Sequence, residues 1–195
     1  MKNLTNKKLL ELLRKKSACS DAVKWIGGKS LLTAWRTCPR ADWMLWFAAR
    51  AGVKKETIVL AGCACARLAL KYVTAGEDRP RICIETTERW TRGEATIDEV
   101  RTARSAADAS AADAYAADAY AADASAYAAY AVDADAYAAD AYAYAAYAAD
   151  AYAYTAYAAD ASGSGSAREQ MQKQCANKVR KIIKTKDLKV GGQTK

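Results

Sequence analysis

Residues 105–162 consist almost entirely of Ala, Asp and Tyr, in phrases such as AADAYAADAY, with no Lys, Arg, Glu, Gly or Pro. Alanine has the highest helix propensity, by up to about 0.7 kcal/mol over ordinary residues, so the tract is expected to be helical. The alternative is a β-helix of five-residue repeats, because aspartates recur every five residues from Asp108 to Asp123. That fold requires a large apolar residue at each inward position, where this chain has Ala. Helix is therefore the prediction.

The tract also separates the charges of the chain. It contains nine aspartates and no basic residue, a formal charge of −9, whereas the whole chain has a net charge of +8. Residues 1–104 carry a net +10 and residues 163–195 a net +7. Such a separation of charge determines the electric field around a protein and therefore its partners, but it does not indicate the fold. Either the acidic tract lies against the basic body, or the basic surface meets an anionic partner.

Cap and turn residues divide residues 1–104 into short helices. Ser20 is expected to be the N-cap of one helix, and Pro39 suits the first turn of another. Thr96 and Glu99 have the spacing of a capping box, in which each side chain accepts a hydrogen bond from the other residue's backbone. The helix that starts there meets no breaker before the tract ends. A helix of that length is stable only when it packs, so we expect it to bend.

The fold class predicted is all-α: a compact multi-helix head, long Ala/Asp/Tyr helices packed on it, and a C-terminal amphipathic helix. The bend in the tract is expected at Ser125 or in the region Asp133–Asp135. The predicted order is a basic Trp- and Arg-rich head, the tract, a flexible joint, the last helix and a disordered tail. These parts occupy residues 1–104, 105–162, 163–166, 167–186 and 187–195.

Composition argues against several classes of function. The chain has no His, which excludes Ser–His and Cys–His catalysis and His-based metal sites. The spacing of its six cysteines matches no zinc or disulfide framework, so buried reduced thiols are expected. No apolar run reaches about 18 residues, so we expect a soluble protein of the cytoplasm with no membrane partner. We expect no enzyme activity, no cofactor and no metal.

Arg and Trp side chains of the head form the candidate ligand-binding group. Arginine forks a phosphate and stacks on aromatic rings, and tryptophan stacks on a nucleobase. The candidates are Arg40, Trp43, Arg50, Arg67, Arg79, Arg81 and Trp90. The competing interpretation is structural, because Trp43 and Trp46 at i,i+3 are also typical of a helix face in a core. Both interpretations stay open at this point.

Arg67 lies within the apolar segment IVLAGCACARLALKYV, where burying an unpaired charge would cost several kcal/mol. It therefore needs a partner. One hypothesis is a buried ion pair that ties helices together, with Asp42, Glu85 or Glu88 as the carboxylate. The other is contact with an anionic ligand.

Three phrases and the tract that follows them resemble the immunity protein family with an immunity-protein-five-like domain. The phrases are TCPRADWMLWFAARAG, VLAGCACARLALKYV and GEDRPRICIETTERWTRGE. The resemblance covers about residues 19–185, and members are similar in having an Ala/Asp/Tyr tract of variable length. This chain departs from them by having SGSGS before the last helix. The most specific parts are Cys38-Pro39-Arg40-x-Asp42-Trp43, Cys63-Ala64-Cys65-Ala66-Arg67 and Arg79-Pro80-Arg81.

The family takes its label from association with bacterial toxin loci, and related genes occur in bacteriophages. The resemblance thus implies a small non-catalytic protein, acting in a bacterium or a phage-infected host, that neutralises a target. The resemblance does not imply what that target is. Together with the basic Trp- and Arg-rich head, it leads us to expect a protein toxin or a small anionic ligand such as a nucleotide. The alternative is a structural protein that forms homo-oligomers through its Ala/Tyr helices. Nucleic-acid binding through the basic head is disfavoured, because the chain has no recognised nucleic-acid-binding motif.

Overall fold

The computed structural model describes residues 6–114, 117–133, 144, 145, 147, 148, 151 and 165–189. Every regular element within these ranges is a helix, which confirms the all-α prediction. The α-helices are α1 (Asn6–Lys15), α2 (Ser20–Ile26), α3 (Leu31–Thr37), α4 (Ala41–Arg50), α5 (Lys55–Ala69), α6 (Arg79–Thr91), α7 (Ile97–Asp113), α8 (Ala117–Asp133) and α10 (Gly165–Ile182). Two short 3-10 helices, η1 (Leu70–Tyr72) and η2 (Thr185–Asp187), follow α5 and α10.

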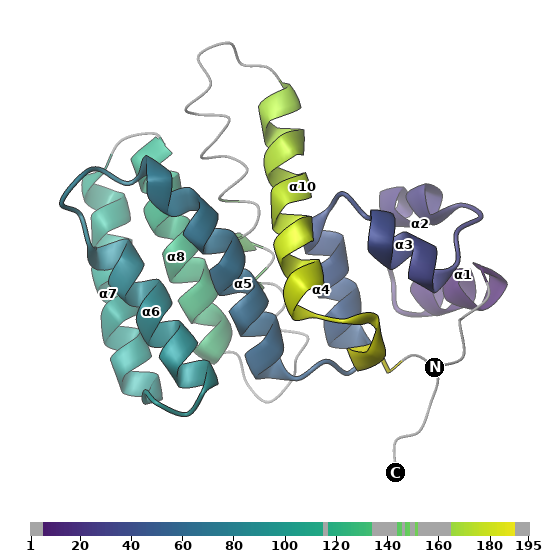
Figure 1. The fold of residues 1–195 in the computed structure, drawn as a ribbon, viewed down its shortest axis with the longest axis horizontal. Helices are drawn as coiled ribbons and strands as arrows, with labels where there is room; N and C mark the ends of the chain where they lie inside the picture. The colour runs from purple at the N-terminus through teal and green to yellow at the C-terminus, as the bar shows by residue number, and fades with distance from the viewer. Residues whose placement is uncertain are drawn as a thin grey trace.

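The helices form a bundle at one end of the molecule and a smaller group at the other (Figure 1). In the bundle, α8 contacts α5, α6 and α7, and α6 contacts both α5 and α7. Helices α1, α2 and α3 form the smaller group, on the right in Figure 1. Helices α4 and α10 lie between the two, and α10 packs on both α4 and α5. The last helix in the chain therefore connects the two ends of the fold.

Helix α5 lies at the centre of the core, as its nearly continuous apolar sequence predicts. Ile58, Val59, Cys63, Cys65 and Ala66 have no exposed surface. One hydrophobic cluster runs without interruption from α1 to α10 and includes these residues. Of the residues described, none lies in a helix that is both long and apolar enough to span a bilayer.

The described part of the Ala/Asp/Tyr tract is helical and packs through its alanines. Helix α8 contacts α5, α6 and α7, and small side chains allow this close approach. Its fully buried alanines are Ala121, Ala124, Ala128, Ala129 and Ala131. The alanines of the tract thus form a helix–helix contact surface.

The break in the long helix lies earlier than predicted. Helix α7 ends at Asp113, and Ala114 has an extended backbone with φ −91° and ψ 167°. Ser125 is buried in the middle of α8, where its hydroxyl donates to the carbonyl of Ala121 at 3.3 Å. The bend expected at Ser125 is therefore wrong, because α8 continues through this buried residue to Asp133. The other predicted position, Asp133–Asp135, falls largely outside the described residues.

One of the three predicted helix starts is confirmed in detail. The backbone nitrogen of Thr96 donates to Glu99 Oε2 at 2.7 Å, and the Glu99 nitrogen donates to Thr96 Oγ1 at 3.2 Å. The other two starts differ by one or two residues. Ser20 is the first residue of α2, whose N-cap is Cys19 without a side-chain cap bond. Pro39 lies two residues before the start of α4 instead of in its first turn.

The end of the chain is more ordered than predicted. Helix α10 begins at Gly165, inside the segment expected to be a joint, and ends at Ile182. Leu188 is only 3% exposed, and the Lys189 nitrogen donates to the carbonyl of Ala51 at 2.7 Å. Residues 187–189 therefore pack on the body, and residues 190–195 lie outside the described residues.

Candidate functional site

Helices α1 to α4 line a cavity of about 380 Å³. Its wall is mostly apolar and includes the aromatic side chains of Trp25, Trp35, Trp43, Trp46 and Phe47. Sites for small molecules measure about 300–1,000 Å³ and are mostly apolar with a few polar groups. The cavity lies at the lower end of that range, which suits one ring system with a substituent better than an extended chain.

The aromatic rings converge because of their positions on three short helices. Trp25 comes from α2, Trp35 from α3, and Trp43 with Trp46 from α4. Residues three apart on a helix share a face, so Trp43 and Trp46 point to the same side of α4. The Trp25 and Trp43 rings touch at a tilt, with centroids 6.1 Å apart and planes at 55°. Trp43 and Trp46 both pack against the core and line the cavity, so the two interpretations of this pair are compatible.

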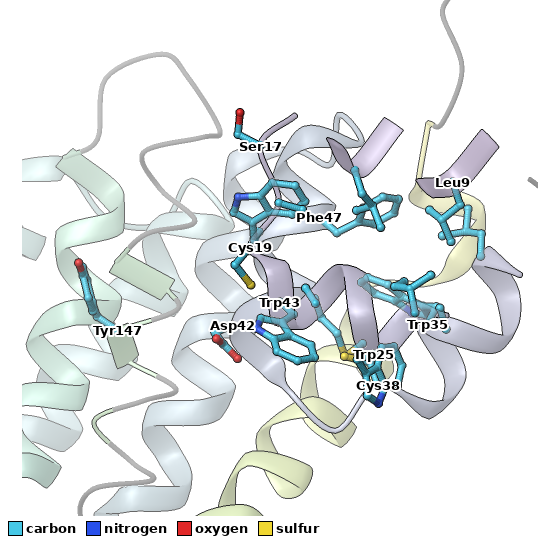
Figure 2. A pocket seen from close by; sticks show the side chains of 18 residues that line it. Leu9, Ser17, Cys19, Trp25, Trp35, Cys38, Asp42, Trp43, Phe47 and Tyr147 are labelled. Atoms are coloured by element: carbon cyan, nitrogen blue, oxygen red, sulfur yellow. The ribbon is translucent and has the colours of Figure 1, made fainter. Parts of the chain in front are cut away.

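The polar groups of the cavity lie on the side that faces Tyr147. Figure 2 shows Cys19, Asp42 and Trp43 on that side, opposite the Tyr147 ring. Of the lining residues that the structure describes, Asp42 is the only one with a charge. Its carboxylate accepts two hydrogen bonds from Arg40, one from Nε at 2.8 Å and one from Nη2 at 2.6 Å. The acid is therefore held in place and compensated by a cation.

A positive charge stands next to three of the tryptophan rings. Lys29 Nζ lies 4.4 Å from the centroid of Trp25, and Arg50 Cζ lies 4.2 Å from that of Trp46. The third pair is Arg40 with Trp43, at 5.1 Å. All three distances are within the range of about 6 Å for cation–π attraction. These cations surround the wall without being among the lining residues.

A fourth cation reaches the wall from the C-terminal helix. Arg180 on α10 donates to the carbonyl of Cys38 at 2.7 Å and to that of Trp35 at 3.2 Å. It also lies 3.4 Å from the sulfur of Met44. Partial burial lowers the pKa of Arg180, which still leaves a guanidinium charged at neutral pH. Arg180 thus fastens α10 to the segment between α3 and α4.

The Arg180→Met variant is expected to be less stable by about 1–3 kcal/mol, because two half-buried carbonyls lose a charged donor. Urea unfolding followed by circular dichroism measures the change. Lys181→Met is the control, since Lys181 is exposed on the same helix. Equal stability of the two variants would show that Arg180 does not hold α10 in place.

The remaining predicted site residues lie on α5 and α6, away from the cavity. Arg67 forms the predicted ion pair with Glu88, through two hydrogen bonds of 2.7 Å each. The expectation that this pair is buried is wrong, because the Arg67 side chain is 39% exposed. It lies at the edge of α5, where apolar neighbours in sequence do not enclose it. Glu88 is thus the one of the three candidate carboxylates that pairs with Arg67.

Arg79 and Arg81 also form ion pairs with acidic residues close to them in the sequence. Arg79 Nε donates to Glu77 at 2.9 Å, and this interaction lowers the pKa of Glu77 to about 2. Arg81 Nη1 lies 3.0 Å from Glu85 Oε2. Trp90 has Lys55 Nζ at 5.6 Å from its ring centroid. The structure therefore brings together Arg40, Trp43 and Arg50 of the predicted group, and not Arg67, Arg79, Arg81 and Trp90.

Several residues of the cavity were not predicted from sequence. Trp25 and Lys29 are i,i+4 neighbours in sequence, and this spacing could have identified the pair. Trp35 and Phe47 give no signal beyond their apolar character. Arg180 is more than a hundred residues away from the carbonyls that it binds, so no local pattern marks it.

The described residues that line the cavity include one weakly nucleophilic thiol, Cys38, and no cluster that could hold a metal ion. Burial raises the pKa of the Cys38 thiol to about 11, so this cysteine is protonated at neutral pH and weakly reactive. Within the described ranges, no three His, Cys, Asp or Glu side chains lie together as a metal site. The arrangement is suited to binding a ligand by contact and charge.

Buried thiols also predict how stability depends on pH. Burial raises the pKa of Cys38 to about 11 and that of Cys83 to about 12, from an ordinary value of 9.0. As pH rises, the thiols of the unfolded chain lose their protons at lower pH than those of the folded protein. Their contribution to the stability of the folded state is therefore complete below about pH 9 and is lost as pH rises toward 11 to 12. For Cys38 this stabilisation is on the order of a few kcal/mol.

We therefore expect urea unfolding of Cys38→Ala to show a smaller loss of stability between about pH 8 and pH 10 than the parent chain. Cys19→Ala is the control, because Cys19 is exposed. The same pH dependence in the parent and in Cys38→Ala would contradict the assignment.

Comparison of the chain with protein-family models, with curated proteins and with solved structures found no match. The resemblance to the immunity protein family therefore stays a prediction from the quoted motifs.

Proposed function

We propose that this chain is a non-catalytic binding protein of immunity or phage counter-immunity type. It acts by neutralising a protein toxin or by sequestering an anionic, nucleotide-like signalling ligand. The observation that supports this best is the aromatic cavity, because it offers a formed site of suitable volume with positive charges around it. The motifs quoted from the sequence supply the immunity assignment.

The size and lining of the cavity are the reason why it supports a binding function. The cavity is open to solvent, has a volume of about 380 Å³ and is lined mostly by apolar side chains, as sites for small molecules are. It leaves apolar surface that a ligand with a flat ring can bury, and each Trp ring contributes a large contact area.

The chemistry of the wall favours binding over catalysis. Two hydrogen bonds from Arg40 hold the Asp42 carboxylate in place. Cys38 is protonated at neutral pH.

Filling the cavity tests the proposal. Ala22 lines the cavity, so Ala22→Phe is expected to weaken binding of AMP and other mononucleotides by at least about tenfold, and to abolish neutralising activity in cells. Quenching of tryptophan fluorescence on titration measures binding. Ala112→Phe, on the exposed face of α7, is the control and should bind like the parent. If no mononucleotide or toxin binds, or if Ala22→Phe is as active as the parent, the cavity is not the site.

A second function, self-association through the tract, is favoured by its tyrosines. Tyr127, Tyr130, Tyr144 and Tyr147 form a cluster with ring centroids 5.4 to 6.4 Å apart. Tyr147 and Tyr120 are 55% and 41% exposed. Light scattering over a range of protein concentrations tests this alternative: a constant monomer mass argues against it, and a dimer that Tyr120→Ser weakens supports it.

A further inference from the structure

We infer that the C-terminal helix α10 sets the shape of the cavity through Arg180, and that ligand binding and the docking of α10 therefore stabilise each other. Arg180 is a positioning residue, because it holds residues of the wall without being among the lining residues. The inference rests on the proposed function, since it adds a controlling element to the same cavity.

Arg180 caps helix α3 from a distant part of the chain. The last carbonyl groups of a helix have no donor within the helix, and its C-terminal end carries a partial negative charge. At the end of α3, Arg180 Nη1 donates to the carbonyl of Trp35 at 3.2 Å and to that of Cys38, the C-cap residue, at 2.7 Å. Hydrogen bonds from a charged donor are roughly twice as strong as those between neutral groups. The end of α3 is therefore held by α10 as well as by its own neighbours in sequence.

The groups that Arg180 contacts belong to the cavity wall. Trp35, Cys38 and Met44 all line the cavity, and the sulfur of Met44 lies 3.4 Å from the same Nη1 atom. Trp35 belongs to α3 and Met44 to α4, and Cys38 lies in the turn between them. One nitrogen atom thus fixes how far the end of α3 stands from α4. Because both helices contribute to the wall, this distance affects the width of the cavity.

The position of Arg180 depends in turn on the docking of α10. Asn177, about one turn earlier, accepts a hydrogen bond of 2.8 Å from Arg180 Nη2 and so orients the guanidinium. Ile183, which follows the end of α10, is fully buried. Beyond it, the backbone nitrogen of Lys189 donates to the carbonyl of Ala51 at 2.7 Å. The C-terminal part of α10 and the segment after it therefore contact α4 near both of its ends.

This contact fixes the orientation of the α1–α3 group. Among the hydrogen bonds between described residues, those of Arg180 are the ones that join this group to a helix from another part of the chain. Apart from the turn between α3 and α4, the group is attached mostly by apolar packing, which is non-directional. Loss of the Arg180 contact is therefore expected to let the wall relax.

Coupling between two sites is reciprocal. If release of α10 from the wall lowers the affinity for a ligand by some factor, binding of the ligand opposes the release of α10 by the same factor. A protein with an occupied cavity thus keeps α10 docked, and one with an empty cavity releases it more often. The occupancy of the cavity is in this way communicated to the surface of α10.

Substitution of Arg180 tests the effect on binding. Arg180→Met is expected to bind AMP at least about fivefold more weakly than the parent chain, which is the lower end of the range for coupled sites. Arg180→Lys should bind with intermediate affinity, because an ammonium keeps the charge and a donor but lacks the planar fork. Quenching of tryptophan fluorescence measures the affinities, at a temperature at which circular dichroism shows every variant to be folded.

Two controls separate this role from a general effect on stability. Lys181→Met removes an exposed charge from the same helix, and Val100→Ala removes buried methyl groups from α7, outside the cavity. Both should bind AMP like the parent chain, although Val100→Ala is less stable. If Arg180→Met also binds like the parent, Arg180 does not position the wall and the inference is overturned.

Hydrogen exchange of the unmodified protein tests the reciprocal effect without any substitution. At an AMP concentration ten times the Kd, the amides of residues 176–183 should exchange up to about elevenfold more slowly, which is the factor 1 + [L]/Kd. Amides of α7, which does not line the cavity, should change less. Equal slowing in α7 and α10, or no slowing in α10, would show that ligand binding is not linked to the docking of α10.

The outcomes separate this inference from the proposed function. If AMP binds and Ala22→Phe prevents it, but neither Arg180→Met nor hydrogen exchange shows a link to α10, the cavity is a ligand site and only the coupling fails. If the parent chain binds no mononucleotide, the coupling fails together with this part of the proposed function.

Discussion

Replacing Ala128 with glutamate is expected to lower the free energy of unfolding by at least about 3–5 kcal/mol, enough to unfold much of the protein. Ala128 is fully buried on α8, which packs against α5, α6 and α7. A carboxylate at this position would be an unpaired charge in an apolar contact, and it would also need space that the packing does not provide. Because small domains are stable by only about 5–15 kcal/mol, the loss is a large part of the total.

Ala112→Glu is the matched control for this prediction. Ala112 belongs to the same tract but is exposed on α7, so the substitution should change stability by no more than about 0.5 kcal/mol. Urea unfolding followed by circular dichroism compares the two variants with the parent chain. If both substitutions are equally mild, the alanines of α8 do not pack as the structure shows.

Replacing Gly62 with leucine is expected to destabilise the protein by about 3 kcal/mol, at the upper end of the range for overpacked cores. A Cβ atom placed on Gly62 would lie 3.1 Å from the Cβ and 3.2 Å from the Cα of Ala145. The second of these is a backbone atom, which cannot rotate away as a side chain can. This glycine therefore sets how closely α5 and the Ala/Asp/Tyr tract approach each other.

Three variants with side chains of different size and position distinguish the effect of this close contact from the general effect of substitution in α5. Gly62→Ala should be close to neutral, because a gain of up to about 1 kcal/mol in helix propensity offsets the tight contact. Ala64→Leu, at a partly exposed position on the same helix, should cost less than Gly62→Leu. Thermal or urea unfolding of the three variants gives the order. A stable Gly62→Leu protein would mean that Ala145 is not packed against α5.

Local physical chemistry explains which features could be predicted from the amino-acid order. The helical state of the described part of the tract follows from alanine's propensity, and the Thr96–Glu99 capping box from a spacing of three residues. The pairing of Arg40 and Arg50 with tryptophans also lies within one helical turn. In each case the interacting groups are at most four residues apart. Backbone geometry alone then brings them together.

The amino-acid sequence by itself determined the all-α class, the central position of α5 and the proximity of Arg40 and Arg50 to tryptophans of the same helix. Only the tertiary structure decided that the long helix breaks at Ala114, that Arg67 is exposed, and that Arg180 reaches the cavity wall from α10. It also separated the predicted group of arginines and tryptophans into a cavity set and an α5–α6 set. The physical reason is that these outcomes depend on which helix faces meet across long stretches of chain. Helix propensity and spacing are properties of neighbours, whereas burial and the position of a cavity arise only when distant helices pack together.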